Sequence, residues 1–266
     1  MKKIPATVMV LTHNSASTLV RALSSVKDFG ELLVVDGGST DETLSIAEAA
    51  GATILRQPPP FLKDGKIIDF AGVRNFGLKH AKYDWVLWLD SDEAASSGLV
   101  TEIKETLEQD CPPGAFKIPA GIVLDGRNIK YSSNYPGYQV RFFHRAAGTF
   151  KKPIHERFVV SEQYPLREFA HPWHYFTESE TQLREFNRDV DRDLPLYRAR
   201  YRDLSFASKV YGVYRSLRII VGIVAKTLLN LILHPFDEGR FPLWYEWLRT
   251  QYQVSVIFAI LTSNKS

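Results

Sequence analysis

The sequence is poor in cysteine, since Cys111 is the single one among 266 residues. One thiol excludes an internal disulfide framework and a zinc site built from several cysteines. It is typical of a reducing compartment, so we expect a cytoplasmic protein. The amino terminus also lacks the long apolar core of a signal peptide, because its short run VMVL stops at Thr12. We interpret this run as a first strand.

An excess of charge of one sign is also missing. Lys and Arg number 33 against 30 Asp and Glu, a formal net charge of +3. Electrostatic binding to nucleic acid usually needs a concentrated basic patch, so nucleic acid is not an expected partner. The patterns GxSxG, GxxxxGK[ST] and HExxH do not occur. Their absence removes the commonest hydrolase elbow, the P-loop and a metalloprotease helix.

The first half of the chain alternates apolar runs with helical patterns. The runs at 7–12, 31–36, 52–55 and 83–90 are too continuous for surface strands. Ser39 and Glu42 have the spacing of a capping box, which predicts that a helix begins there and continues to Gly51. Further helical patterns cover 18–26 and 73–81. This alternation predicts a doubly wound, Rossmann-like α/β fold whose mostly parallel sheet is covered on both faces.

The second half differs in pattern. Short β-rich runs lie between Phe116 and Val160, and helical patterns dominate from Thr177 onward. We therefore predict one domain over residues 1–176 and a helical region over 177–266.

The most apolar segment of the chain is 217–233, interrupted by Arg218, Lys226 and Asn230. Residues 198–226 carry seven basic side chains and one acidic one, a local charge of +6. Three interpretations stay open: a buried helix with a solvated basic face, peripheral contact of 198–233 with an anionic membrane, and a transmembrane span.

Polar residues follow several of the predicted strands. Asp90 and Asp92 leave the strand at 83–90, and two carboxylates at this spacing can hold Mg²⁺ or Mn²⁺ through oxygen ligands. Asp36 ends another strand before two glycines, which fits a nucleotide contact or a plain turn capped by Ser39. Ligands of open parallel sheets bind at the carboxyl ends of the strands, where these groups should converge.

Three more candidates come from chemistry alone. Arg74 could neutralise a diphosphate, although it also fits the surface of an amphipathic helix. Glu156 could be a general base oriented by His155, although such a pair also fits a structural role. His174 could complete a metal shell that Asp92 opens.

Four segments, VMVLTHN, VVDGGSTDET, GVRNFGL and DWVLWLDSDE, occur in this order between Val8 and Glu93. In order and spacing they resemble the inverting glycosyltransferases of family two, which have the GT-A fold. The second half, with RFFHR, IHE, HY and LHPFDEGRF, is similar to the branch of lipopolysaccharide-core glucosyltransferases.

The resemblance implies a role for each nucleotide-side residue. Thr12, Asn14 and Asp36 would contact the nucleoside, Arg74 the diphosphate and Asp90 the ribose. Residues 1–93 would then bind the nucleotide-sugar, and 94–176 would form the acceptor side.

The resemblance also implies the metal and the catalytic base. Asp92 would bind Mn²⁺ or Mg²⁺ through the diphosphate, helped by His174. The family's usual Glu-Asp base motif is not evident, so Glu156 is the candidate base by analogy with this branch, and Glu93 competes with it.

The expected activity is transfer of a sugar from a nucleotide-sugar, UDP-linked, to a hydroxyl of a glycan or glycolipid in cell-surface polysaccharide or lipopolysaccharide synthesis. The basic, apolar region would place the enzyme at the inner face of the plasma membrane. Two alternatives stay open. A sugar nucleotidyltransferase would need a Gly-rich loop that THNSAST lacks, and a silent nucleotide-sugar binding module would not depend on Glu156.

Overall fold

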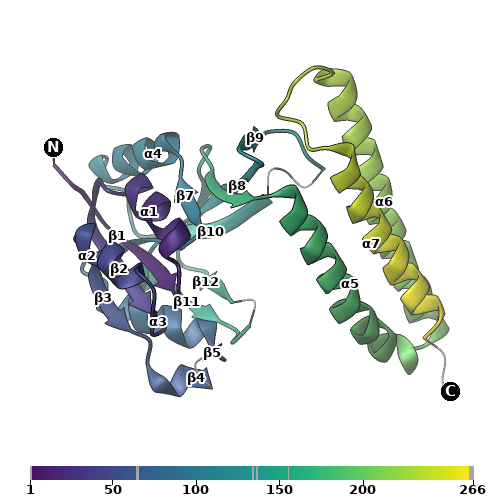
Figure 1. Ribbon diagram of the computed structural model, residues 1–266, viewed down its shortest axis with the longest axis horizontal. Helices are drawn as coiled ribbons and strands as arrows, with labels where there is room; N and C mark the ends of the chain where they lie inside the picture. Colours follow the sequence, from purple (N-terminus) through teal and green to yellow (C-terminus); the bar gives the residue numbers. More distant parts are fainter. Residues whose placement is uncertain (1, 64–65, 134, 136, 155, 264–266) are drawn as a thin grey trace. The chain divides into compact units, whose positions relative to one another are not determined.

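The computed structural model describes residues 2–63, 66–133, 135, 137–154 and 156–263 (Figure 1). His155, which the sequence pairs with Glu156, lies outside the described residues. The chain forms two compact units. Unit 1 comprises Met1–Ala120 and Pro136–Tyr175, and unit 2 comprises Gly121–Tyr135 and Phe176–Ser266.

A mixed sheet organises unit 1. Its parallel half has the order β3 (Thr53–Arg56), β2 (Phe29–Asp36), β1 (Ile4–Thr12) and β6 (Trp85–Asp90). The path continues through β10 (Gly137–His144), β8 (Ala115–Leu124), β14 (Trp173–Thr177) and β7 (Glu93–Ala95), while β13 (Leu166–Glu168) and β9 (Arg127–Ile129) pair with β8. Two hairpins form separate small sheets that do not pair with it. They are β4 (Leu62–Lys63) with β5 (Lys66–Ile67) and β11 (Gly148–Lys151) with β12 (Arg157–Val160).

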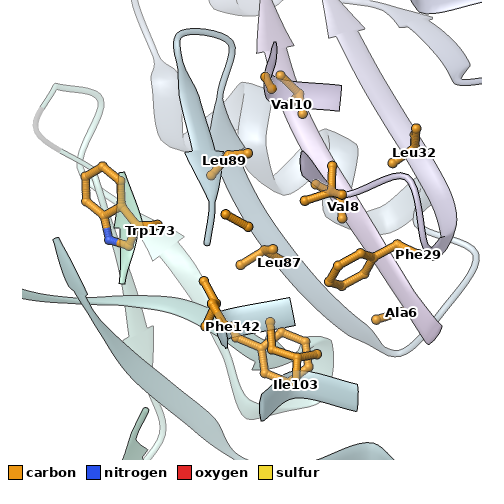
Figure 2. Packing of buried hydrophobic residues seen from close by; sticks show 14 of the residues in the cluster. Ala6, Val8, Val10, Phe29, Leu32, Leu87, Leu89, Ile103, Phe142 and Trp173 are labelled. Atoms are coloured by element: carbon orange, nitrogen blue, oxygen red, sulfur yellow. The ribbon is translucent and has the colours of Figure 1, made fainter. Parts of the chain in front are cut away.

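Both faces of this sheet are buried, as its continuous apolar strands predict. Val8 and Val10 of β1 pack in one cluster, which Figure 2 shows, and Met9 between them packs in a second. The first cluster is covered by α1 (Ala16–Ser25), α2 (Thr43–Ala49) and α4 (Ser97–Glu108), and the second by α3 (Phe70–His80) and the β11–β12 hairpin. Each buried aliphatic side chain contributes roughly 1.5–3 kcal/mol, so two-sided burial accounts for the stability of the sheet. The predicted α/β fold is confirmed.

One local prediction is wrong. The capping box at Ser39 and Glu42 does not form, because α2 begins at Thr43 and its N-cap, Glu42, makes no side-chain hydrogen bond. Asp41 instead accepts from the backbone and hydroxyl of Thr43. The Ser39 hydroxyl donates to Asp36, so the end of β2 competes successfully for the predicted capping group.

Unit 2 contains the expected helices, α5 (Ser179–Arg202), α6 (Phe206–Leu233) and α7 (Leu243–Leu261). α7 packs against both α5 and α6. Glu246 of α7 is buried and accepts from the backbone N–H of Ser133 at 2.7 Å. By length and composition α6 could cross a membrane, and only 11% of its most apolar window is buried in the structure. The interpretation of this segment as a buried core helix therefore fails for the part of the chain that is described.

Candidate active site

The carboxyl ends of three parallel strands meet in unit 1. Thr12 of β1 pairs in register with Asp36 of β2, and Leu11 pairs with Asp90 of β6. The convergence predicted for Thr12, Asp36 and Asp90 is therefore observed. Each of these strands leads into a loop, and polar groups of the loops form hydrogen bonds that hold the loops in shape.

Asp36 organises the turn after β2. Its carboxylate accepts from Thr12 Oγ1 at 2.8 Å, Gly38 N at 2.7 Å and Ser39 N at 2.8 Å, and from the Ser39 hydroxyl at 2.5 Å. Burial raises the pKa of Asp36, but hydrogen bonds from Ser39, Thr12 and Gly38 outweigh it and hold this pKa below its ordinary value. Asp36 is thus an ionised carboxylate whose two oxygens are both engaged by its own loop and by Thr12.

Asn14 joins this turn to the loop after β1. Its backbone has a φ of 50°, a left-handed conformation that asparagine tolerates better than most residues. Its N–H donates to the Ser39 hydroxyl at 2.8 Å, and its side-chain oxygen accepts from Thr40 N at 2.8 Å. In the described structure, Asn14 and Asp36 together fix the shape of the two loops at the edge of the sheet.

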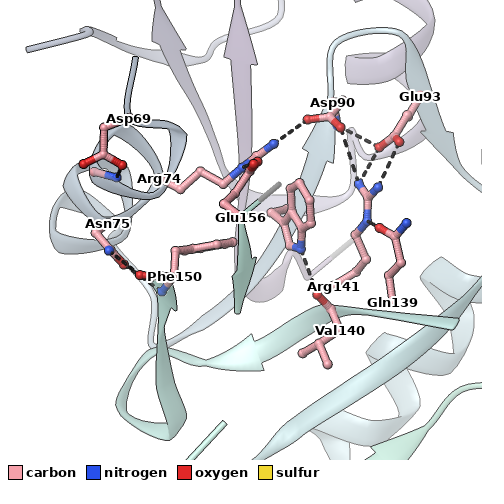
Figure 3. A network of polar contacts seen from close by, with 12 residues as sticks. Asp69, Arg74, Asn75, Asp90, Glu93, Gln139, Val140, Arg141, Phe150 and Glu156 are labelled. Atoms are coloured by element: carbon pink, nitrogen blue, oxygen red, sulfur yellow. Dashed lines mark hydrogen bonds and ion pairs between the residues drawn. The ribbon is translucent and has the colours of Figure 1, made fainter. Parts of the chain in front are cut away.

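A charged network surrounds the end of β6 (Figure 3). Arg74 of α3 donates through Nη2 to Asp90 at 2.8 Å and through Nε to Glu156 at 2.7 Å. Arg141 of β10 binds both oxygens of Glu93, at 2.5 and 3.0 Å, and lies 3.9 Å from Asp90 Oδ2. Both arginine side chains are 3–4% exposed, so these are buried charges held by carboxylates.

The two acidic groups at this strand end have opposite net pKa shifts. Burial raises the pKa of Asp90, but the positive charges of Arg74 and Arg141 more than offset it, and the pKa lies below its ordinary value. For Glu93, burial raises the pKa to about 7, opposed by Arg141 and assisted by the charge of Asp90. Up to about neutral pH the Asp90–Glu93 pair therefore holds one proton, on Glu93, while Asp90 is ionised.

Aromatic rings support both arginines. Trp88 of β6 lies between the two guanidinium groups, with Arg74 Cζ 3.8 Å and Arg141 Cζ 3.9 Å from the ring centroid. Arg141 also lies 3.9 Å from the centroid of Trp173. The indole N–H of Trp88 donates to the carbonyl of Val140 at 2.9 Å, which fixes the ring. These cation–π contacts hold the guanidiniums in place without neutralising them.

Two cavities meet at Arg74 and Asp90. The first, of about 470 Å³, is lined by Thr12, Gln57, Phe70 and neighbouring residues. The second, of about 610 Å³, is lined by Trp88, Arg141, Glu156, Tyr138, Gln139 and Arg157 among others. Asn14, Asp36 and Asp92 do not line either one. Arg74 Nη1 is buried and has no hydrogen-bond partner among the described residues.

The proposed metal ligands are placed near one another in the fold without forming a complete site. Asp92 is exposed, and its carboxylate has no hydrogen bond or ion pair with described residues. His174 of β14 pairs in register with Ala94 of β7, two residues after Asp92, and its Nε2 is buried and unpartnered within the described chain. Burial lowers the pKa of His174 and favours the neutral form that binds metals.

No group of three or more His, Cys, Asp or Glu side chains that could hold a metal occurs among the described residues. An ion at Asp92 would therefore need oxygen ligands from outside the chain. The chain itself would supply the Asp92 carboxylate and the neutral imidazole of His174, which are groups that can bind such an ion.

Sequence reasoning missed Arg141, Trp88 and Gln57. Arg141 lies in RFFHR, which contributes to the family resemblance, but nothing in the sequence shows that it would face Glu93. Gln57 directly follows β3, so the strand-end rule could have found it. Its side chain is buried and donates to the carbonyl of Val35 at 3.1 Å.

The model of glycosyl transferase family 2 matches residues 7–171, more than half of the chain. The chain belongs to this family. It is 38% identical over 104 residues to an uncharacterized glycosyltransferase of Rickettsia bellii, an alignment that covers 39% of this chain and 32% of that protein. The chain thus spans about a third of the length of such curated relatives.

Two other proteins extend the comparison. The lipopolysaccharide core biosynthesis glycosyltransferase LpsC of Rhizobium meliloti is 26% identical over 162 residues, covering 59% of this chain and 58% of LpsC. The mannosyltransferase PcManGT of Pyrobaculum calidifontis, solved with GDP-Man and Mn²⁺, superposes with a TM-score of 0.52 at 16% identity over 98% of this chain and 88% of that one. The family two resemblance and the GT-A fold are therefore confirmed.

Proposed function

We propose that this chain transfers a sugar from a nucleotide-sugar to a hydroxyl of a glycan or glycolipid, with inversion at the anomeric carbon. The observation that carries the proposal is the meeting of two cavities at Arg74 and Asp90. One cavity would hold the donor nucleoside and the other the acceptor, so the anomeric carbon would lie where the two join. The similarity to LpsC supports an acceptor in lipopolysaccharide or another cell-surface polysaccharide.

The donor would occupy the cavity lined by Thr12, Gln57 and Phe70. Its diphosphate would approach Arg74, whose buried Nη1 still has a hydrogen-bond donor to offer. A guanidinium prefers such bidentate oxygen groups. Asp90 would bind the ribose. Asp36 and Asn14 would hold in shape the loops after β1 and β2, which would lie beside the nucleoside. We take UDP as the first nucleotide to test and GDP as the second.

Asp92 would hold Mn²⁺ or Mg²⁺ together with the diphosphate, and His174 would offer its neutral imidazole. When bound, the ion would stabilise the negative charge of the departing diphosphate. The chain's own cations, Arg74 and Arg141, contribute positive charge beside Asp90.

Glu156 is the better candidate for the base. It lines the proposed acceptor cavity, and among the described residues one of its oxygens is engaged, by Arg74 Nε. Glu93 is 7% exposed, and its oxygens are bound by Arg141 and by the N–H of Asp90. Glu156 would take the acceptor proton while the acceptor oxygen bonds to the anomeric carbon and the bond to the diphosphate breaks.

The first experiment is a calorimetric titration of UDP, GDP and dTDP, each with Mn²⁺ and with EDTA, on wild type and on Asp92→Ala. We expect metal-dependent binding of one diphosphate that the variant loses. Failure of all three nucleotides to bind in either condition would contradict the proposal.

Assays of wild type and of Glu156→Gln separate a glycosyltransferase from a silent binding module and from a nucleotidyltransferase. We expect the variant to keep nucleotide binding and to lose turnover by roughly 10²–10⁴-fold, the usual contribution of a general base. A silent binding module would show no turnover in wild type. A nucleotidyltransferase would release pyrophosphate from a nucleoside triphosphate, which a coupled phosphate assay detects.

A further inference from the structure

The apolar residues of α6 face away from the rest of unit 2. Large side chains recur at intervals of three and four residues, at Tyr214, Leu217, Val221, Val224, Leu228 and Ile232. With 3.6 residues per turn these positions share one face. Each of these six side chains is at least 45% exposed. We call this face the apolar stripe of α6.

The opposite face of α6 is the buried one, although it is less apolar. Its buried residues are Gly212, Ser216 and Ile223. A Cβ added at Gly212 would lie 2.7 Å from the ring of Tyr201, so this face is held by a close approach that larger residues would prevent. The helix therefore cannot turn its apolar stripe inward without losing that packing. In a water-soluble helix the larger apolar residues would be on the buried side.

The neighbouring helix α7 repeats the arrangement. Leu243, Trp247, Val254 and Phe258 recur at helical spacing and are more than half exposed. The buried side of α7 carries Glu246, Val256, Ala259 and Ile260. An exposed apolar surface of this extent marks a surface that is covered by something else.

Charge indicates what covers it. α6 has no acidic residue in its 28 positions but has Lys209, Arg215, Arg218 and Lys226. Arg215 and Arg218 are exposed, and no ion pair within the described chain involves either. A second copy of the same surface would bring like charges together, whereas anionic lipid headgroups would neutralise them.

We propose that unit 2 docks on an anionic lipid bilayer, with the apolar stripe of α6 and the exposed face of α7 in the headgroup boundary. Arg215 and Arg218 directly follow Tyr214 and Leu217 of the stripe along the helix, and both are exposed and would contact lipid phosphates. Trp244 and Trp247 have the amphipathic rings that favour this depth. Lys226 donates to the backbone carbonyl of Tyr135, which ties α6 to the 121–135 segment and opposes its insertion across a bilayer.

The experiment is flotation of the full chain with vesicles of phosphatidylcholine alone and with phosphatidylglycerol added, at low and high salt. We expect binding to the anionic vesicles, reversed by salt. Leu217→Gln with Val224→Gln should lower the partition coefficient by at least about 10-fold, because two aliphatic contacts are lost. Arg218→Gln should lower it by about 5-fold, the equivalent of one basic residue at an anionic surface.

The matched control is Leu183→Gln with Leu196→Gln on α5. These leucines are 48% and 62% exposed and lie outside α6 and α7, so the double change should leave the partition coefficient unchanged. Circular dichroism of each variant establishes that it is folded.

Three outcomes would overturn the proposal. Equal binding to neutral and anionic vesicles would remove the role of Arg215 and Arg218. Retention in the membrane after high salt and alkaline washing would mean that α6 crosses it. Absence from all vesicles, with self-association abolished by the stripe variant, would mean that a second copy covers the surface. None of these depends on glycosyl transfer.

Discussion

At the scale of single residues, two arginines on either side of one tryptophan determine the charge at the end of β6. Arg74 and Arg141 both stack on Trp88 and both face Asp90, yet each has its own carboxylate partner, Glu156 or Glu93. Burial makes each of these charges depend on its partner. Stability and pH response should therefore be coupled at this site.

Glu93→Gln tests the raised pKa. Because the folded state retains the proton of Glu93 to about pH 7, while its ordinary pKa is 4.5, this group's contribution to stability is complete below pH 4.5 and is lost as pH rises through 7. Over that range wild type should lose up to about 1.4 kcal/mol per pH unit relative to the variant. Urea unfolding of both proteins between pH 4.5 and 8 measures the difference. Parallel profiles would show that Glu93 is ionised throughout.

Arg141→Met tests the buried pair. Removing this cation leaves Glu93 without a counterion, and at pH 8 the free energy of unfolding should fall by about 3–5 kcal/mol. The loss should be smaller at pH 5, where Glu93 keeps its proton, and smaller again when Arg141→Met is combined with Glu93→Gln. Urea unfolding of the single and double variants at both pH values measures these differences.

A matched control is Arg145→Met, which breaks an Arg–Asp pair at 2.6 Å whose side chains are 40% and 56% exposed. An exposed pair is worth no more than about 1 kcal/mol. An equal loss for Arg141→Met and Arg145→Met would refute the importance of burial here.

At the scale of elements, α3 positions both Arg74 and the β11–β12 hairpin. Arg74 points to Asp90, while Asn75 accepts from Phe150 N at 3.0 Å and donates to its carbonyl at 2.9 Å. Adjacent residues of one helix thus place Arg74 beside Asp90 and fasten β11. The distance between α3 and the sheet therefore matters for the site.

Gly77→Ala tests this distance. A Cβ at Gly77 would lie 2.5 Å from the thioether sulfur of Met9 and 3.1 Å from Val35, so α3 must move or the core must repack. We expect a loss of about 1–3 kcal/mol in unfolding free energy and weaker nucleotide binding. Adding Met9→Ala should cost less in this variant than in wild type.

Gly222→Ala on α6 is the control, because a Cβ there meets no atom within 4 Å. It should stabilise the helix by up to about 1 kcal/mol through propensity alone. If Gly77→Ala proves equally harmless, α3 is not held by close contact with β1.

At the scale of the whole molecule, the two proposed ligands belong to different units. The residues proposed to bind the nucleotide lie in unit 1, and the proposed lipid surface lies in unit 2. Binding stabilises the regions that hold the ligand, and hydrogen exchange reports this locally.

Hydrogen exchange measured by mass spectrometry should separate the two sites. A nucleoside diphosphate with Mn²⁺ should slow exchange around 11–14, 36–41 and 90–93 and leave α6 and α7 unchanged. Anionic vesicles should do the reverse. Slower exchange in α6 on nucleotide binding would show that the proposed separation is wrong.

Much of the fold could be predicted from the sequence because its signals are local. The apolar runs that became β1, β2, β3 and β6 differ from the predicted ranges mainly at their ends. The residue at which a helix begins is harder to predict. Ser39 and Glu42 have the right spacing for a capping box, but the buried carboxylate of Asp36 needs donors more than the helix end does.

For the site, too, some features could be predicted from the sequence and others could not. The position of a residue at a strand end is a local property, so Thr12, Asp36 and Asp90 could be brought together from sequence order and the parallel arrangement alone. The proposed roles of Glu156, Asp92 and His174 stay predictions, because neither a bond length nor a fold can assign them.

By itself, the sequence determined the alternation of strands and helices, the family and the edge of the sheet that carries the site. Each of these depends on residue type and order, which act over a few positions. Only the tertiary structure decided that Arg141 reaches Glu93, 48 residues away, that Trp88 separates two guanidiniums, and that α6 turns its apolar stripe outward. Those facts depend on which surfaces pack together, and packing is set by the whole chain.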